Sequence, residues 1–125
     1  MDDLAQCLRA LSEEVRLRII MLLSRGELCV CDIMEVLNEP QSKVSRHLSY
    51  LKNSGLITAK RVGVWMHYSL AELEDEMSRA QIDFMKERFS RLPRFKDDRD
   101  KAEALKQRKL CQGPRPRRLK DRQMP

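Results

Sequence analysis

The sequence predicts a mainly α-helical domain that carries one β-hairpin. Apolar residues recur at helical spacing through residues 3–53, where capping residues and glycines divide them into four short helices. Two β-rich runs follow, residues 56–61 and 64–70, on either side of a Val62-Gly63 turn. The helical spacing then returns, and at 125 residues the chain has room for one compact domain.

The first two helices are expected over residues 3–12 and from there to about residue 24. Leucines at helical spacing form an apolar face on the first. Ser12 offers the second helix an N-cap, and Gly26 suits the left-handed position that follows a helix. These two residues therefore mark the expected ends of the second helix.

The next two helices have the pattern of a helix-turn-helix. Residues 31–37 form a short apolar helix, and Pro40 suits the first turn of the helix that follows over residues 41–53. That second helix is apolar on one face, and polar and basic on the other. A hairpin placed directly after a basic helix is typical of a wing, so we expect a winged helix-turn-helix.

The last helix is expected to run from Glu72 until Pro93 ends it. Together with the first helix it carries more apolar surface than one small domain can cover. We therefore expect a homodimer that pairs through the first and last helices.

Charge divides the chain into two parts. The formal net charge is +6, but residues 93–125 alone hold 12 basic and 5 acidic side chains. Four of the five prolines also lie there, and such a composition buries too little surface to offset chain entropy. We expect a DNA-binding and dimerisation domain over residues 1–92, and a basic, largely disordered tail over residues 93–125.

A second basic feature lies inside the domain. Residues 40–68 contain five basic side chains, two histidines and no carboxylate. A cationic span in an otherwise acidic domain is a typical electrostatic footprint for a polyanion such as nucleic acid.

Several classes of protein are not expected. No apolar run approaches the ~20 residues that span a bilayer, and Asp2 and Asp3 stand where a secretory leader would be basic or apolar. No phosphate-binding glycine loop, catalytic triad pattern or H-E-x-x-H motif occurs, so we expect no enzyme and no organic cofactor. A cytoplasmic protein is expected, in which the four cysteines are mostly reduced thiols.

Cys29-Val30-Cys31 is the unusual motif. Within a regular helix, residues two apart point ~200° away from each other. Both thiols can bind one small ion only if Cys29 lies on the turn before the helix and Cys31 lies in its first turn. A helix N-terminus lowers thiol pKa, and paired thiolates select soft ions. Small cysteines also fill cores, so inert packing is the alternative.

Four segments make the chain resemble the ArsR/SmtB family of homodimeric winged-helix repressors, which leave their operator when a metal or metalloid binds. The likeness covers roughly residues 4–92, and the first segment is most like the arsenic-responsive members. The segments are Glu27-Leu28-Cys29-Val30-Cys31-Asp32, Gln41-Ser42-Lys43-Val44-Ser45-Arg46-His47-Leu48, Leu51-Lys52-Asn53-Ser54-Gly55-Leu56-Ile57 and Gly63-Val64-Trp65-Met66-His67-Tyr68.

The resemblance implies that Cys29 and Cys31 bind the inducer, and that a palindromic operator DNA is the partner. The exposed part of the recognition helix and the wing would bind this DNA, with Gln41 and Arg46 as the preferred readers of bases. The residues expected at the DNA are Gln41, Ser42, Lys43, Ser45, Arg46, His47, Lys52, Lys60 and Arg61.

Two departures affect the inducer site and the recognition helix. Met34 stands where arsenic-responsive members often have a third cysteine, and Pro40 where the family often has a capping serine. The third ligand stays open between Cys111 and Cys7, while a two-thiol site would suit an organic arsenical. Residues 72–92 contain no histidine, so we expect no zinc site there.

The sequence therefore predicts a repressor that releases DNA when As(III), or Sb(III), binds cysteine thiolates. Three alternatives remain. The inducer is Cd(II) or Pb(II), the regulator responds to a Cys29–Cys31 disulfide, or it binds DNA constitutively with inert cysteines.

Overall fold

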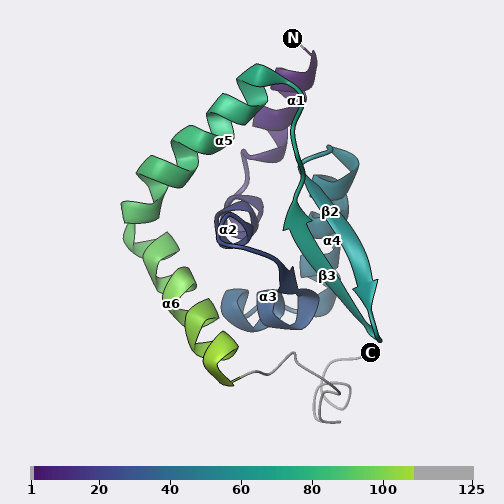
Figure 1. Cartoon of the computed structure of the whole chain (residues 1–125), viewed down its shortest axis with the longest axis vertical. Coiled ribbons are helices and arrows are strands. Elements are labelled where there is room, and N and C mark those ends of the chain that lie inside the picture. Colours follow the sequence, from purple (N-terminus) through teal and green to yellow (C-terminus); the bar gives the residue numbers. More distant parts are fainter. Residues whose placement is uncertain (1, 109–125) are drawn as a thin grey trace.

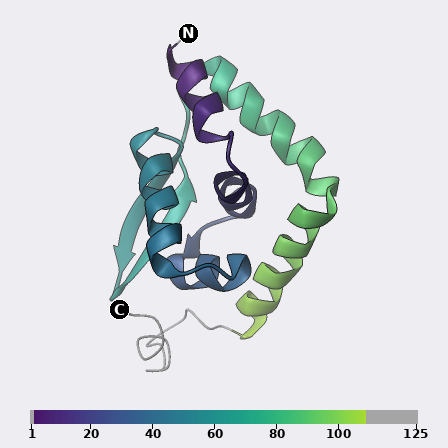
Figure 2. The ribbon, with the colours of Figure 1, turned by 180° about the vertical axis from the view of Figure 1, so that it is seen from behind.

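The computed structural model describes residues 2–108, in which helices surround a central helix and a small antiparallel sheet flanks them. In Figure 1, α5 and α6 form an arc on one side of α2, and α4 and the hairpin lie on the other. Figure 2 shows the same arrangement from behind. No helix among these residues is both long and apolar enough to cross a membrane. The elements are α1 (Asp2–Ala10), α2 (Glu14–Leu23), β1 (Leu28–Cys29), α3 (Val30–Leu37), α4 (Gln41–Asn53), β2 (Ile57–Val62), β3 (Trp65–Leu70), α5 (Glu76–Arg88), the 3-10 helix η1 (Phe89–Arg91) and α6 (Pro93–Arg108).

Helix α2 forms the centre of the core because it is apolar on most of its circumference. Ile19 and Ile20 have no exposed surface, and they pack in one cluster with Ile33 of α3 and Leu48 of α4. A helix that is apolar nearly all round is stable only when other elements enclose it. The helices on both sides of α2 meet this requirement.

The N-cap of α2 is Glu13, not the expected Ser12. The Glu13 carboxylate accepts the backbone N–H of Arg16 at 3.0 Å. Ser12 still belongs to the turn that closes α1, since its N–H and its hydroxyl both donate to the carbonyl of Arg9. Gly26 has φ +136°, a conformation that suits glycine, but it lies two residues after the C-cap Ser24 instead of directly after it.

The tight connection between α3 and α4 forms the expected helix-turn-helix. Asn38 adopts the left-handed conformation at φ +55° and donates its N–H to the Met34 carbonyl at 2.8 Å. Pro40 is the extended N-cap of α4, one position before the first-turn site expected for it. The bounds of α4 agree with the expected residues 41–53.

The sheet has three antiparallel strands in the order β1-β3-β2, not two. The hairpin pairs Ile57 with Leu70 and Val62 with Trp65, and Gly63 in its turn has φ +66°. The unexpected strand β1 pairs Cys29 with His67. Two residues are too few to give a sequence pattern, so only their pairing with β3 defines this strand.

Helix α5 begins at Glu76, four residues later than expected. Its N-cap Asp75 accepts the backbone N–H of Ser78 at 2.8 Å and the Ser78 hydroxyl at 2.6 Å. This cap fixes the start of the helix, and residues 71–74 connect it to β3 without helical structure.

Helix α6 corrects the expectation of disorder over residues 93–108. The helical run of α5 and η1 stops at the extended Leu92, directly before Pro93 as expected, but Pro93 is also the first residue of α6. Asp98 and Leu105 are 2% and 3% exposed, and the Asp98 carboxylate receives two 2.9 Å hydrogen bonds from the guanidinium of Arg18. Average composition does not predict this helix, because only a few spaced residues anchor a segment that is otherwise charged. Residues 109–125 lie outside the described part of the chain.

Candidate functional site

Helix α4 presents a polar stripe to solvent. Ser42, Arg46 and Ser49 are exposed and recur at the spacing that places side chains on one helix face. Gln41 and Ser45 are half-buried beside this stripe. The opposite face of α4 is anchored in the core by Val44, Leu48 and Leu51. A rigid, accessible face of this kind can approach the edges of bases in a groove.

The basic residues expected at the DNA fall into two groups. The ammonium of Lys43 lies 3.3 Å from Glu39, and that of Lys60 lies 3.3 Å from Glu27, so each charge is partly neutralised. Among the described residues, Arg46, Lys52 and Arg61 make no ion pair and are exposed. These three are the charges most available to a polyanion.

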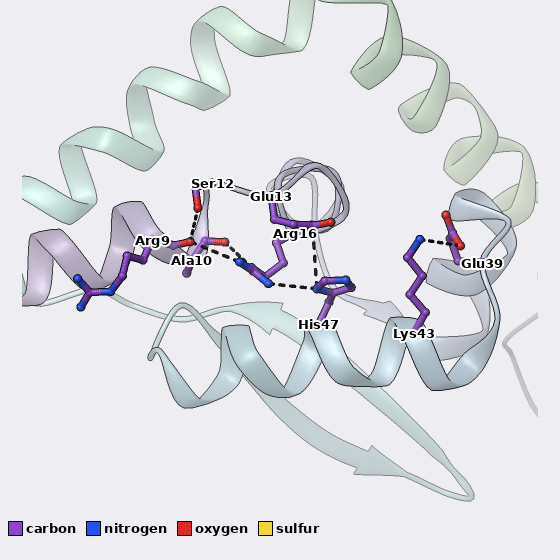
Figure 3. A network of polar contacts seen from close by, with 8 residues as sticks. All are labelled: Arg9, Ala10, Ser12, Glu13, Arg16, Glu39, Lys43 and His47. Carbon is purple, nitrogen blue, oxygen red and sulfur yellow. Dashed lines mark hydrogen bonds and ion pairs between the residues drawn. The ribbon is translucent and has the colours of Figure 1, made fainter.

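His47 does not lie on this exposed face, contrary to the expectation. Its side chain is 8% exposed, with Nδ1 3.2 Å from Arg16 Nη1 and 3.8 Å from a Glu13 carboxylate oxygen (Figure 3). Burial lowers the pKa of His47, and the charges of Arg16, Arg46 and Lys43 lower it further against the opposing effect of Glu13. His47 thus joins α4 to α2 through Arg16 and Glu13.

Arg16 is the residue of this network that sequence reasoning missed. Its Nε donates to the carbonyl of Ala10 at 2.7 Å, at the end of α1, while its guanidinium lies 4.2 Å from the Tyr50 ring centroid on α4. One side chain of α2 thus contacts both α1 and α4, as Figure 3 shows for Ala10 and His47. No sequence signal distinguishes it from the neighbouring arginines.

Cys29 and Cys31 occupy the expected positions. Cys29 lies in β1 and is the N-cap of α3, and Cys31 lies in the first turn of that helix. The two Cα atoms lie 5.4 Å apart, and a disulfide joins the sulfurs. The sequence predicts reduced thiols here, but the structure has the pair oxidised. The disulfide must be reduced before the two sulfurs can bind an ion.

The cysteine pair is buried but separate from the main core. Cys29 is 1% and Cys31 4% exposed, and both pack against the half-buried Trp65 of the wing. Asp32 is also buried, and a ligand atom from each of Asp32, Cys29 and Cys31 lies within 4.8 Å of the others. Two sulfurs and one carboxylate oxygen form a donor set that suits a thiophilic ion better than Mg²⁺ or Ca²⁺.

Asp32 was not expected as a ligand, and Cys7, one of the two expected third ligands, does not join this group. Cys7 is buried in α1 beside Ser78, and burial raises the pKa of its thiol, with the Asp75 carboxylate adding to the effect against a hydrogen bond with Ser78. Met34 packs against the main core. Cys111 lies outside the described residues.

A charged cluster connects the wing to the cysteine strand. Glu27, just before β1, lies 2.9 Å from His67 Nδ1 on β3 and 3.3 Å from Lys60 Nζ on β2. Burial acts to raise the pKa of Glu27, but Lys60 and His67 outweigh it and leave that pKa lowered. Cys29 pairs with His67 across the sheet, so the cysteine strand and the wing belong to one sheet.

An apolar surface lies on α1 and α5. Leu8, Met77 and Phe84 are 45%, 58% and 49% exposed. Large side chains of this type are unusual on a free surface and common where two chains meet.

The chain is similar to known bacterial regulators. Residues 13–59 match the family described as "Bacterial regulatory protein, arsR family". The arsenical resistance operon repressor of Escherichia coli (strain K12) is 48% identical over 67 residues, which are 53% of this chain and 57% of that protein. This chain therefore spans little more than half of the length of that relative.

Two further comparisons cover more of the related protein. The arsenical resistance operon repressor of Bacillus subtilis (strain 168) is 41% identical over 70 residues, 55% of this chain and 67% of that protein. The solution structure of the homodimeric winged helix-turn-helix DNA-binding domain Mb0332 of Mycobacterium bovis superposes with a TM-score of 0.58 at 29% identity. That comparison covers 68% of this chain and 76% of the other. The fold is therefore a winged helix-turn-helix.

Proposed function

Because this chain belongs to the arsR family of bacterial regulatory proteins, a family of regulators and not of enzymes, we propose that it is a repressor that binds operator DNA as a homodimer and releases it when trivalent arsenic binds Cys29 and Cys31. A regulator of this kind works in the cytoplasm, where the DNA is. The observation that carries the proposal is the position of the two sulfurs. They lie at the start of α3, one helix before the exposed face of α4, and contact the wing through Trp65.

In the proposed complex, α4 enters the major groove and the wing follows the backbone. A twofold dimer presents two such helices about one DNA turn apart, ~34 Å, so the operator is palindromic. Arg46 and Gln41 read base edges with Ser42 and Ser45 beside them, because arginine pairs with guanine and glutamine with adenine. Phosphate contacts come from the half-buried Lys43 and from the exposed Lys52, Lys60 and Arg61.

The dimer is proposed to form through α1 and α5. Their exposed apolar side chains, Leu8, Met77 and Phe84, need cover that the single chain does not supply. The Mycobacterium bovis domain with the same fold is homodimeric. The twofold pairing of these helices supplies the two recognition helices that a palindrome requires.

The proposed inducer chemistry is thiol exchange at arsenic. After a cellular thiol has reduced the disulfide, each of the two thiols gives its proton to a hydroxyl of As(OH)₃, two waters leave, and two As–S bonds form. The third arsenic position keeps a hydroxyl, or takes an oxygen of Asp32, whose carboxylate lies within 4.8 Å of the sulfurs. Sb(III) has the same chemistry, and an organic arsenical needs only the two sulfurs.

Inducer binding is proposed to weaken DNA binding by two routes. An arsenic atom between the sulfurs changes the bend from β1 into α3, which shifts α3 against α4. The same change displaces Cys29 relative to His67 and so moves the wing. Arsenic and DNA must weaken each other's binding by the same factor. A typical coupling free energy of ~1–3 kcal/mol makes this factor ~5–150-fold.

The test uses a duplex that the reduced protein itself selects from a random library. Fluorescence anisotropy of this duplex is followed while As(III) is added in the presence of a phosphine reductant, which does not chelate arsenic. We expect wild type, Cys7→Ser and Cys111→Ser to release the DNA, and Cys29→Ser/Cys31→Ser to keep it. Release by the double variant contradicts the arsenic part of the proposal.

The same titration separates the inducers. Cd(II) and Pb(II) prefer three or four sulfurs, so release by these ions would depend on Cys7 or Cys111 and show thiolate charge-transfer absorbance. If Cd(II) releases DNA at lower concentration than As(III), the cadmium alternative replaces the arsenic one. No selected duplex at all would contradict the repressor assignment.

A redox-responsive regulator is the second candidate, and the Cys29–Cys31 disulfide favours it. In that mechanism a peroxide takes two electrons from the thiol pair, the S–S bond forms, and two waters are the products. DNA affinity would then change on peroxide addition without any metal, and mass spectrometry would show the loss of two hydrogens from the peptide that holds both cysteines. An unchanged affinity in fully oxidised protein would exclude this candidate.

A further inference from the structure

A cavity of about 230 Å³ lies between α2, α6 and the end of α5, and the proposed function does not use it. Figures 1 and 2 show α5 and α6 on the side of α2 that faces away from α4. The cavity is therefore remote from the helix proposed to bind DNA. The mouth and walls of the cavity come from segments far apart in sequence, so the tertiary fold creates it.

Three cations line this cavity, and no carboxylate is among the residues that line it. They are Arg25 after α2, Lys86 on α5 and Arg99 on α6. Within residues 2–108, none of the three makes an ion pair or a side-chain hydrogen bond. By contrast, Arg18 and Arg94 of the same helices are paired with Asp98 and Glu14. Like charges brought together repel each other, and an anion between them would relieve this repulsion.

The remaining lining is suited to an anion with an apolar body. Ser24 and Ser90 also line the cavity, but their hydroxyls donate to backbone carbonyls, so the three cations are the groups that can bind an anion here. Met21 and Leu22 form an apolar wall with the half-buried ring of Phe95. A free inorganic ion would leave this wall without a contact.

We propose that the cavity binds a small organic phosphate, with the phosphate between Arg25, Lys86 and Arg99 and the apolar part against Phe95. A phosphate monoester carries about −1.5 to −2 charges at pH 7, which matches three cations better than one carboxylate does. Arginine forks hold phosphate oxygens in pairs. Such a ligand joins α2, α5 and α6, and its binding stabilises the folded state by mass action.

Phenyl phosphate is the probe, measured by calorimetry and by the thermal unfolding midpoint of the full chain at constant ionic strength. We expect saturable binding and a raised midpoint with phenyl phosphate, a smaller effect with inorganic phosphate or benzoate, and none with phenol. Backbone amide shifts in NMR should be largest at Ser24, Ser90 and their neighbours. Equal effects of phenyl phosphate and phenol would overturn the proposal.

Charge-matched variants locate the binding. Arg99→Gln and Arg25→Gln should each weaken phenyl phosphate binding at least tenfold and leave the ligand-free unfolding midpoint nearly unchanged. Lys101→Gln removes the same charge from an exposed position of α6 that does not line the cavity, and it should bind as wild type does. If Lys101→Gln lost as much affinity for phenyl phosphate as Arg99→Gln, the effect would be one of net charge, and the proposal would be overturned. Neither result depends on DNA or arsenic.

Discussion

The His47 imidazole shows how the environment of one residue determines its role. It lies at a position whose sequence neighbours are exposed and basic, but its ring is buried against Arg16 and Glu13. The sequence pattern assigned it to the DNA face because its helical position is at the border of that face. Arg16, on another helix, defines the side to which the ring turns.

The lowered pKa of His47 predicts a pH-dependent stability. In the pH range just below about 6.5, the unfolded chain binds a proton at this histidine and the folded chain does not, so stability falls as the pH decreases. The groups that face the ring are Glu13, Arg16, Arg46 and Lys43. Denaturant unfolding of wild type should give a lower unfolding free energy at pH 5.5 than at pH 7. His47→Gln should reduce this difference, and an unchanged difference would contradict the assignment.

The exposed cations predict unequal effects on DNA affinity. Arg46→Ala should lower affinity for the selected operator by ~1–3 kcal/mol and relax specificity, because an unpaired guanidinium that reads a base is lost. Lys43→Ala should cost less, since Glu39 already lies 3.3 Å from that ammonium. Affinity is measured at several salt concentrations, and Lys52→Ala should reduce the salt slope by about one. Equal losses in all three variants would contradict the division into paired and unpaired cations.

A buried ion pair joins α6 to α2, beside the apolar contacts of Leu105 with the core. The Arg18 guanidinium and the Asp98 carboxylate are 8% and 3% exposed and form two hydrogen bonds. The hydrogen bond from Arg18 to Asp98 raises the pKa of Arg18 despite burial, so the arginine stays charged. Asp98→Ala leaves that charge buried without its partner, which typically costs ~3–5 kcal/mol.

The experiment compares Asp98→Ala with Asp97→Ala in thermal unfolding and amide hydrogen exchange. Asp97 is exposed and makes no ion pair with a described residue, so its replacement should change little. Asp98→Ala should lose protection in α6 and destabilise the whole domain. Replacing both partners by apolar residues, Arg18→Met/Asp98→Leu, should recover much of the loss. Similar behaviour of both single variants would show that α6 is held by other contacts.

Elements with local signals were predictable, and those that depend on tertiary contacts were not. The bounds of α4 follow from Pro40, the helical spacing of apolar residues and Gly55, all adjacent in sequence. Strand β1 exists only through its pairing with β3, and α6 only through Asp98, Leu105 and their partners. In the candidate site, the turn that brings Cys29 next to Cys31 was predictable. The cover by Trp65 was not, since it comes from a strand far along the chain.

At the scale of the whole molecule, the apolar surface of α1 and α5 predicts that DNA binding depends on assembly. Phe84→Glu places a charge on an exposed ring position and should shift sedimentation toward the monomer. Operator affinity should fall with it, because one recognition helix then binds a half-site alone. Lys101→Glu on α6 is the surface control and should stay dimeric. A monomeric Phe84→Glu variant with full operator affinity would contradict a dimeric repressor.

The contact of Trp65 with the cysteine pair has a practical consequence. Trp65 is the only tryptophan of the chain, and it packs against the cluster of Cys29 and Cys31. Indole emission is sensitive to neighbouring sulfur, to heavy atoms and to exposure to water. The protein thus contains its own fluorophore at the cysteine pair, and its emission reports the oxidation state and occupancy of these sulfurs without an added label.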